Sequence, residues 1–180
     1  MRVITGKARG IVLKTPNGMA TRPTADRVKE ALFRIIQLDV PTAKVLDLFG
    51  GTGQLGIEAL SRDAASAVFV DEREDACKLI RENLKRTKLE QFARVIRSDY
   101  MAYLKTCKEK YDIILLDPPY AEVFLENSLK MITEIDILQS GGIIVSERPY
   151  GKELSWDFPG YPRSKDYKYG NTVITIFRKQ

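Results

Sequence analysis

Residues 115–124, LLDPPYAEVF, place an aspartate, two prolines and a tyrosine directly after an apolar run. Proline cannot donate a hydrogen bond to a strand ladder, so the pair Pro118–Pro119 ends the strand abruptly. The residue before a proline is also pushed into extended geometry, which fixes the backbone of Asp117. The tetrapeptide therefore presents one carboxylate, one free carbonyl and the aromatic ring of Tyr120 at the end of a strand.

These groups suit a reaction at the exocyclic amine of a nucleobase. Such an amine is a poor nucleophile because its lone pair is delocalised into the ring. The Asp117 carboxylate and the Pro118 carbonyl could accept its two hydrogens, localise the lone pair and aim it at a methyl group carried on sulfonium. Prolines hold both acceptors at fixed geometry, which is catalysis by positioning. The Tyr120 ring offers a face for an extruded base, and a plain turn with a packed tyrosine is the alternative.

A glycine-rich loop, LDLFGGTGQLG at residues 46–56, supplies a second group of candidates. Gly51, Gly53 and Gly56 satisfy the pattern GxGxxG after a strand, and Asp71 lies 20 residues beyond Gly51. Glycines let the backbone approach a ligand closely, and a strand-end carboxylate can bind ribose hydroxyls. This pattern suits a nicotinamide dinucleotide as well as S-adenosylmethionine. A tight strand–helix turn with a solvated aspartate is the simpler alternative.

Further strand-end acids favour S-adenosylmethionine. Asp47 comes just before Phe49, where dinucleotide sites usually keep apolar residues, and it could bind the cationic amino-acid end of the cofactor. Asp99 could accept from an adenine amino group, although taken alone it is typical of a helix N-cap. Glu147 could also line the site, or need no special role. Ligands of such sheets bind outside the carboxyl ends of the strands. The acids predicted there are Asp47, Asp71, Asp99 and Asp117.

Alternating strands and helices must position these groups. Hydrophobic patterns predict strands at 44–49, 67–71, 93–99, 111–117, 141–147 and 171–179, and helices at 54–62, 73–86, 99–107 and 122–135. Elements that alternate at this spacing form right-handed βαβ units in an open sheet. Two short strands, 2–6 and 10–15, and a helix that begins near Thr24–Ala25 are predicted to precede them.

The composition narrows the class of protein. The 180 residues, 44% of them hydrophobic, suffice for one domain with a single core. Histidine is absent and Cys77 and Cys107 stand apart, so neither a disulfide framework nor a His/Cys metal site is expected, and a reducing cytoplasm fits. No apolar leader and no run of transmembrane length is present, so no membrane partner is expected.

Positive charge is concentrated at the N-terminus. Residues 1–35 hold eight Lys/Arg against two acids, so the net charge of this segment is +6. The whole chain has a net charge of +5, so the remaining residues together carry close to −1. Basic residues spread in this way can bind RNA phosphates without reading sequence, and a solvated helix face is the alternative. RSKDYKYG, residues 163–170, is either a second contact or a plain loop. The predicted RNA contacts are Lys7, Arg9, Arg22, Arg27, Lys29 and Arg34.

Together these motifs resemble the RsmD family, bacterial S-adenosylmethionine-dependent guanine-N2 methyltransferases of 16S ribosomal RNA. The resemblance rests on DPPY, DLFGGTGQLGIEAL, RVITGKARG and TRPTADRVKEALF, and it covers nearly the whole chain, including GGIIVSE and YKYGNTVITIF. DPPY alone is shared with adenine-N6 DNA methyltransferases, whereas its combination with TRPTADRVKEALF is much more specific. Relatives often have Ala-Gly-Ser-Gly at residues 50–53, where this chain has Gly-Gly-Thr-Gly, which changes no assigned role.

The resemblance implies an α/β, Rossmann-like class I methyltransferase fold. Its seven-stranded, mostly parallel sheet has the last strand antiparallel and follows an N-terminal β-hairpin and helix. A basic extension at 1–40 that contacts RNA and a methyltransferase core at 41–180 are expected to form one compact unit. The implied catalytic residues are Asp117, Pro118, Pro119 and Tyr120, and the implied cofactor-binding residues are Asp47, Phe49, Gly51, Gly53, Asp71 and Asp99.

Three functions remain as hypotheses. The first is methyl transfer from S-adenosylmethionine to the N2 amine of a guanine in ribosomal RNA, either naked or within the small subunit. The second is a DNA adenine-N6 or protein-glutamine methyltransferase with the same tetrad, against which the lack of an obvious target-recognition domain counts. The third is a non-enzymatic nucleotide-binding module, which leaves DPPY unexplained. A cytoplasmic monomer without a metal is expected.

Overall fold

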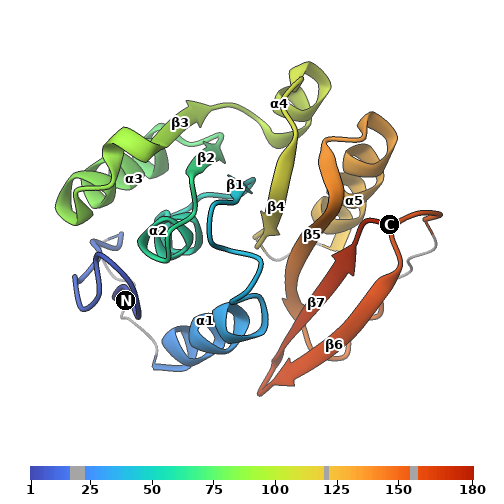
Figure 1. Ribbon diagram of the computed structural model, residues 1–180, viewed down its shortest axis with the longest axis horizontal. Coiled ribbons are helices and arrows are strands. Elements are labelled where there is room, and N and C mark those ends of the chain that lie inside the picture. Colours follow the sequence, from blue (N-terminus) through green and yellow to red (C-terminus); the bar gives the residue numbers. More distant parts are fainter. Residues whose placement is uncertain (17–22, 120–121, 155–157) are drawn as a thin grey trace.

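Seven strands form one mixed sheet in the order β3-β2-β1-β4-β5-β7-β6 (Figure 1). The computed structural model describes residues 1–16, 23–119, 122–154 and 158–180. The strands are β1 (Lys44–Asp47), β2 (Ser66–Asp71), β3 (Ala93–Arg97), β4 (Tyr111–Leu116), β5 (Leu138–Pro149), β6 (Arg163–Tyr169) and β7 (Thr172–Arg178). β1 to β5 run parallel, whereas β7 is antiparallel to both β5 and β6. The predicted Rossmann-like sheet with its antiparallel last strand is confirmed.

Helices cover both faces of the sheet, as consecutive βαβ units require. The helices are α1 (Pro23–Ile35), α2 (Gln54–Ser61), α3 (Glu74–Thr87), α4 (Tyr100–Thr106) and α5 (Glu122–Ile135), with a short 3-10 helix at Glu90–Phe92. The buried side chains of α1, α2 and α3 belong to one apolar cluster, and those of α4 and α5 to a second. No helix among the described residues is both long and apolar enough to cross a membrane.

The central strands are buried on both faces. Successive strand residues point to opposite sides, so Ile113 and Leu115 of β4 pack with α1–α3 while Ile114 and Leu116 pack with α4 and α5. This double burial explains why YDIILL is a continuous apolar run rather than an alternating one. The carboxyl ends of these strands consequently meet at one edge of a rigid sheet.

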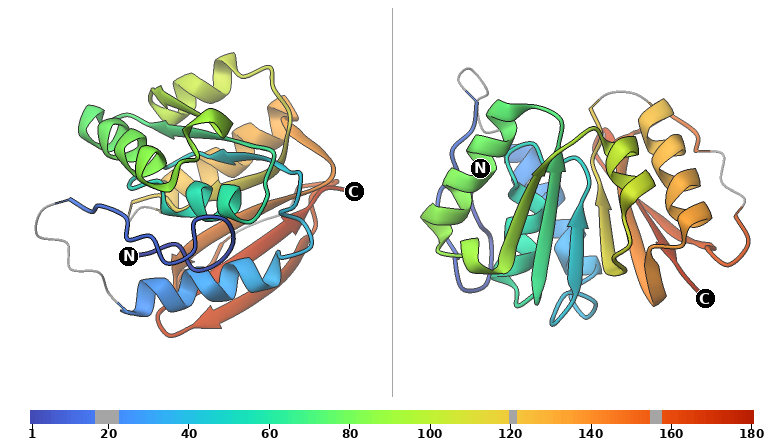
Figure 2. Two further views of the ribbon diagram at one scale, coloured as in Figure 1. Left: turned by 60° about the vertical axis from the view of Figure 1, so that its left-hand side comes forward. Right: turned by 90° about the horizontal axis from the view of Figure 1, so that it is seen from above.

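The predicted N-terminal hairpin is reduced to one isolated bridge between Arg2 and Val12. Gly10 N still donates to Val3 O at 2.8 Å, but 2–6 and 10–15 are not regular strands. Several backbone donors of this segment bind side chains of α2 and α3 instead, which leaves them unavailable to a longer ladder. In the right-hand view of Figure 2 the dark-blue N-terminal segment runs beside α3.

The segment 163–170 is not a plain loop. It contains β6, an edge strand that pairs along its length with β7. Tyr167 and Tyr169 pack against the core that includes α1, whereas Lys168 between them is exposed. The alternation of tyrosine and lysine is therefore that of an amphipathic edge strand.

Candidate active site

A cleft of about 970 Å³ opens at the carboxyl ends of β1 to β5. Its size is at the upper end of ordinary small-molecule sites. Gly53, which precedes α2, does not line the cleft although its neighbours Thr52 and Gln54 do, and Tyr120 lies outside the described residues. The predicted residues that line the cleft are Asp47, Phe49, Gly51, Asp71, Asp99, Asp117, Pro118 and Pro119.

The loop between β1 and α2 requires its glycines. Gly51 and Gly53 have φ of 55° and 79°, in the left-handed region that side chains rarely adopt. A Cβ on Gly56 would lie 2.3 Å from the ring of Phe69, so this glycine lets α2 pack closely on β2. Gly51 N donates to Asp71 Oδ2 at 2.9 Å. The loop geometry and the acid at the end of β2 are thus fixed together.

Asp71 keeps acceptor capacity for a ligand. Its Oδ1 accepts from the backbone N of Arg73 at 2.9 Å, and its Oδ2 accepts from Gly51. Oδ1 also accepts from the exposed Arg73 Nε at 3.4 Å. A carboxylate oxygen has two lone pairs, so a ligand hydroxyl can bind Oδ2 directly and can bind Oδ1 in place of Arg73 Nε. The side chain lines the cleft and is 10% exposed. Such a carboxylate can accept from the two hydroxyls of a ribose.

Asp47 lies at the floor of the same cleft. Its side chain is buried, and its Oδ2 accepts from Gly56 N at 3.0 Å. Burial, and then the charges of Asp117 and Asp71, raise the pKa of Asp47 to about 7. Gln54, in the first turn of α2, also lines the cleft, and its buried Oε1 has no hydrogen-bond partner among the described residues. A buried acceptor without a partner is rare unless a ligand donates to it. The Asp47 carboxyl and Gln54 Oε1 together therefore suit a cationic ammonium group.

Asp99 is the N-cap of α4, because its Oδ1 accepts from Ala102 N at 3.0 Å. Beside it, Tyr100 packs against Phe49 and Phe124 with ring centroids 5.2 Å and 5.6 Å apart. We call these three rings the aromatic cluster. They line the cleft and offer faces on which a nucleobase can stack. Sequence reasoning identified only Phe49, although Tyr100 and Phe124 each stand in the first turn of a helix that follows a strand end.

Two carboxyl groups stand at the ends of neighbouring strands. β4 and β5 are parallel with Leu116 opposite Ser146, so Asp117 and Glu147 occupy the next register position. Both line the cleft, and neither carboxyl accepts a hydrogen bond from the residues that the structure describes. Partial desolvation in the cleft raises the pKa of Asp117 to about 6, although the residue is still exposed to solvent. Burial, and then the charge of Asp117, raise the pKa of Glu147 to about 8.

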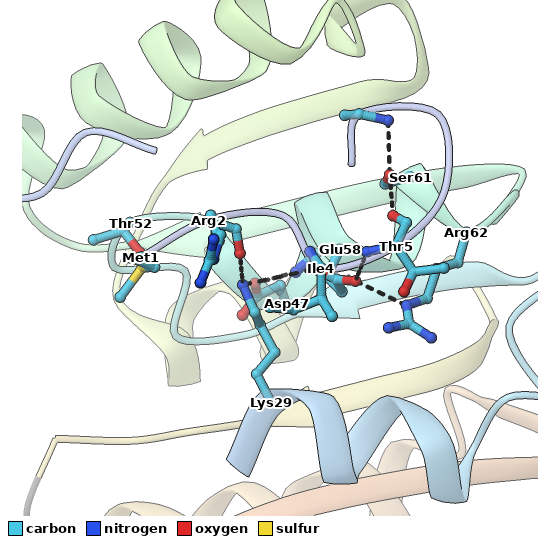
Figure 3. Close-up of polar contacts among 12 residues, drawn as sticks. Met1, Arg2, Ile4, Thr5, Lys29, Asp47, Thr52, Glu58, Ser61 and Arg62 are labelled. Carbon is cyan, nitrogen blue, oxygen red and sulfur yellow. Dashed lines mark hydrogen bonds and ion pairs between the residues drawn. The ribbon is translucent and has the colours of Figure 1, made fainter. Parts of the chain in front are cut away.

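Lys29 departs from its predicted role. Its side chain is 2% exposed, its Nζ donates to Arg2 O at 2.6 Å, and the same nitrogen lies 3.6 Å from Glu58 Oε2 (Figure 3). Lys29 therefore links α1 to the N-terminal segment through a hydrogen bond and to α2 through an ion pair. A side chain buried in this way does not contact RNA phosphates, so Lys29 is removed from the predicted RNA surface.

The N-terminal segment is anchored on α2, the helix that follows the glycine loop (Figure 3). Glu58 accepts from Ile4 N at 2.8 Å and from Thr5 N at 3.1 Å. Ser61 Oγ donates to Thr5 O at 2.6 Å, and a Cβ on Gly6 would lie 1.7 Å from Ser61 O. The backbone passes so close to α2 that only glycine fits at that position.

Asn83 of α3 joins the same segment to the glycine loop. Its Nδ2 donates to Thr52 O at 2.9 Å and to Lys14 O at 3.0 Å, and its Oδ1 accepts from Lys14 N at 2.7 Å. The side chain of Asn83 is fully buried. The position of the loop thus depends on the position of the N-terminal segment.

The other basic residues of this region face solvent. Arg9, Arg27 and Arg34 are exposed, and Lys7 is exposed while its Nζ lies 2.7 Å from Asp63 Oδ1. Arg27 borders a groove between the N-terminal segment and α1, and Met1 lines both this groove and the main cleft. Arg22 lies outside the described residues. Three of the predicted arginines therefore remain as exposed cations, and one of them, Arg27, borders a groove that shares Met1 with the cleft.

Sequence comparison identifies similar proteins. The profile of a family described as Conserved hypothetical protein 95 matches residues 1–178. The protein YlbH of Bacillus subtilis (strain 168) is 38% identical over 183 residues, which cover 100% of both chains. Ribosomal RNA small subunit methyltransferase D of Escherichia coli (strain K12) is 34% identical over 147 residues, which cover 82% of this chain and 74% of that protein.

Comparison with solved structures finds the same fold in other methyltransferases. The solved structure of yhhF from Escherichia coli has a TM-score of 0.91 at 27% identity and covers 100% of this chain and 98% of its own. An RNA methyltransferase from Salinibacter ruber, solved in complex with S-adenosyl-L-homocysteine, has a TM-score of 0.68 at 16% identity. The superposition covers 89% of this chain and 94% of that one, and at this identity it establishes a shared fold alone.

Proposed function

This chain belongs to the RsmD family, described as Conserved hypothetical protein 95, and we propose that it transfers a methyl group from S-adenosylmethionine to the exocyclic N2 amine of a guanine in small-subunit ribosomal RNA. The printed name of its Escherichia coli relative supports ribosomal RNA as the substrate. The observation that carries the proposal is the presence of Asp117, Pro118, the glycine loop and the aromatic cluster in one cleft.

The cleft has the donor and acceptor groups that S-adenosylmethionine needs. When bound, this cofactor supplies an electrophilic methyl group on a sulfonium ion. Asp71 accepts from the ribose hydroxyls, and the second oxygen of Asp99 accepts from the adenine amine. Asp47 and Gln54 bind the ammonium of the amino-acid end, and the buried Gln54 Oε1 without a partner and the buried carboxyl of Asp47 support this assignment. A bound cation also favours the ionised form of Asp47, whose burial opposes ionisation.

Asp117 and Pro118 act on the target amine. The Asp117 carboxylate and the Pro118 carbonyl accept its two hydrogens, which aligns the nitrogen lone pair with the methyl carbon. Positive charge develops on the nitrogen in the transition state, and an ionised Asp117 placed beforehand stabilises that charge. With a pKa of about 6, Asp117 is also a suitable acceptor for the proton that the methylated amine loses.

The N-terminal region holds the RNA. Arg9, Arg27 and Arg34 bind phosphates and position the strand, while the aromatic cluster or Tyr120 stacks the extruded base. In this assignment residues 1–40 are the RNA-contacting extension and residues 41–180 are the methyltransferase core. Every group assigned to the reaction comes from one chain, so a monomer suffices, and no step needs a metal. Bacterial ribosomal RNA is modified in the cytoplasm, where we expect the enzyme to act.

The proposal is tested with RNA from a strain that lacks the gene. Purified protein is incubated with small subunits and with naked ribosomal RNA from that strain, together with labelled S-adenosylmethionine. Digestion to nucleosides and mass spectrometry should reveal N2-methylguanosine, and Asp117→Ala protein should leave the RNA unmodified. Methylation of adenine N6 would replace this proposal with the amino-methyltransferase alternative, and the absence of any methylated nucleoside would overturn it.

A further inference from the structure

We propose that Glu147 is a specificity-determining residue, which reads the N1–H and O6 groups of the guanine whose N2 amine is held by Asp117 and Pro118. The inference rests on the proposed function, because this edge of the base is oriented only once the amine is in place. Asp117 would act on the reacting nitrogen, whereas Glu147 would decide which purine presents that nitrogen.

The sheet sets the spacing of the two carboxyl groups. Leu116 of β4 lies opposite Ser146 of β5, so Asp117 and Glu147 leave neighbouring parallel strands side by side. Register neighbours in a sheet point to the same face, and neighbouring strands lie about 4.8 Å apart. That separation is close to the span from N2 to O6 along a guanine. A base whose amine reaches Asp117 therefore brings the rest of its edge to Glu147.

Glu147 has no structural partner that would account for its burial. No hydrogen bond or ion pair to its carboxyl comes from the residues that the structure describes, although the side chain is half-buried. The adjacent cation, Arg148, is directed elsewhere, because its Nη2 donates to Asp166 Oδ2 at 2.6 Å and its Nη1 donates to Lys152 O. A carboxyl that lines a cleft and makes no bond to the protein remains available to a ligand.

The protonation state suits guanine. The charged groups that line the cleft with Glu147 include Asp117 directly after β4, Asp47 on β1, Arg148 on β5 itself, and Lys152 and Glu153 on the following segment. Burial and the neighbouring Asp117 keep Glu147 protonated at neutral pH. A protonated carboxyl offers one donor and one acceptor. Its carbonyl can accept from N1–H while its hydroxyl donates to O6, which makes two hydrogen bonds to guanine.

A base analogue separates recognition from chemistry. 2-Aminopurine keeps the amine at C2 but lacks N1–H and O6, so it leaves Glu147 with one hydrogen bond, to N1, instead of two. RNA fragments that contain either guanine or 2-aminopurine at the methylated position are compared by kcat/KM. Wild-type protein should favour guanine by about tenfold, the usual effect of one lost hydrogen bond. Glu147→Ala should methylate the two RNAs at nearly equal, reduced rates.

Glu147→Gln serves as the second variant. Its amide also offers a donor and an acceptor, so it should keep the preference for guanine. Glu153→Ala, which removes another acid from the cleft rim, is the matched control and should behave as wild type. A preference retained in Glu147→Ala, or lost in Glu147→Gln, overturns the inference while leaving the proposed function intact. Failure of wild-type protein to methylate the guanine RNA overturns both.

Discussion

Lys29 Nζ lies 3.6 Å from Glu58 Oε2, and the two side chains are 2% and 0% exposed. Burial lowers the pKa of Lys29, and the charges of Glu58 and Asp26 oppose that shift. Because Glu58 also accepts from the backbone of the N-terminal segment, this pair joins α1, α2 and that segment. The cation that the charge pattern assigned to RNA instead stabilises the folded chain.

Lys29→Ala should therefore destabilise the protein. It removes the buried cation beside Glu58 and the donor to Arg2 O, while Arg62 Nε still donates to Glu58 Oε1 at 2.9 Å, so we expect a loss of about 1–3 kcal/mol. Urea denaturation measures the loss. Arg27→Ala, an exposed change on the same helix, should stay within about 0.5 kcal/mol of wild type. Equal stability of the two variants would show that the pair is not structural.

The exposed arginines should carry the RNA affinity. Changing Arg9, Arg27 and Arg34 together to Glu should weaken RNA binding while folding and S-adenosylmethionine affinity stay unchanged. Each lost phosphate contact reduces the slope of log K against log salt by about 0.7–0.9, so the triple variant should lose roughly 2–3 units. The control is Lys105→Glu with Lys108→Glu, two exposed lysines on the α4 side of the sheet. An unchanged slope would place the RNA elsewhere on the surface.

Asp71 should be needed for the cofactor. Asp71→Ala removes a hydrogen-bonded carboxylate that also fixes Gly51 N, and this loss costs about 1.5–3 kcal/mol. Calorimetric titration should show S-adenosylmethionine bound roughly ten- to a hundredfold more weakly. Asp71→Asn keeps one acceptor oxygen for Gly51 N, so its affinity for S-adenosylmethionine should lie between those of wild type and Asp71→Ala. Tight binding of NADH in place of S-adenosylmethionine would contradict the methyltransferase assignment.

Asp117 should matter for turnover and little for cofactor binding. Asp117→Ala should abolish methyl transfer but leave S-adenosylmethionine affinity nearly intact, because its acceptor acts mainly in the transition state. Phe124→Ala, which removes one ring of the aromatic cluster, should mainly raise KM for RNA. Both constants come from steady-state assays with labelled cofactor. A wild-type rate in Asp117→Ala would remove it from the catalytic set.

The stability of the protein should depend on Glu147 in a pH-dependent way. Its pKa rises from 4.5 to about 8 on folding, so the folded state holds a proton that the unfolded state has lost. The free energy of unfolding therefore falls as the pH rises between these values. Glu147→Gln removes the ionisable group and should be more stable than wild type at pH 9, by about 1 kcal/mol or 2–4 °C, since solvent weakens the effect.

Thermal melts at several pH values measure this difference. At pH 4 the two proteins should melt at nearly the same temperature, because the carboxyl is then protonated in both folded and unfolded wild type. Glu153→Gln is the control and should show no such dependence. A constant difference between Glu147→Gln and wild type at every pH would mean that the effect comes from packing.

The strand-end acids were predictable because they follow from local rules. A parallel sheet must place the carboxyl ends of its strands together, so Asp47, Asp71, Asp99 and Asp117 had to share one edge once the strands were known. The aromatic cluster was not predictable in the same way. Phe49, Tyr100 and Phe124 come from different βα connections, and only the packing of α4 against α5 decides that their rings meet.

The burial of Lys29 could have been predicted from its spacing to apolar residues of the helix, which a count of charges does not consider. Lys29 precedes Phe33 by one helical turn and Ile36 by two, so it lies on the apolar face of α1. A lysine on such a face must find an anion, and Glu58 on a separate helix cannot be identified from spacing alone. Charge totals describe a segment, whereas the direction of each side chain depends on the helix that carries it.

An open sheet ends in two strands whose outer backbone groups have no neighbour, and β6 and β3 hold those places here. Such edges can pair with the edge of another molecule and start aggregation. β6 presents the exposed Lys165 and Lys168, and its pairing with β7 is irregular near Arg163. β3 carries Arg94 and Arg97, both in exposed ion pairs. Charge at both borders, and an irregularity at one of them, disfavour growth of the sheet by edge-to-edge addition.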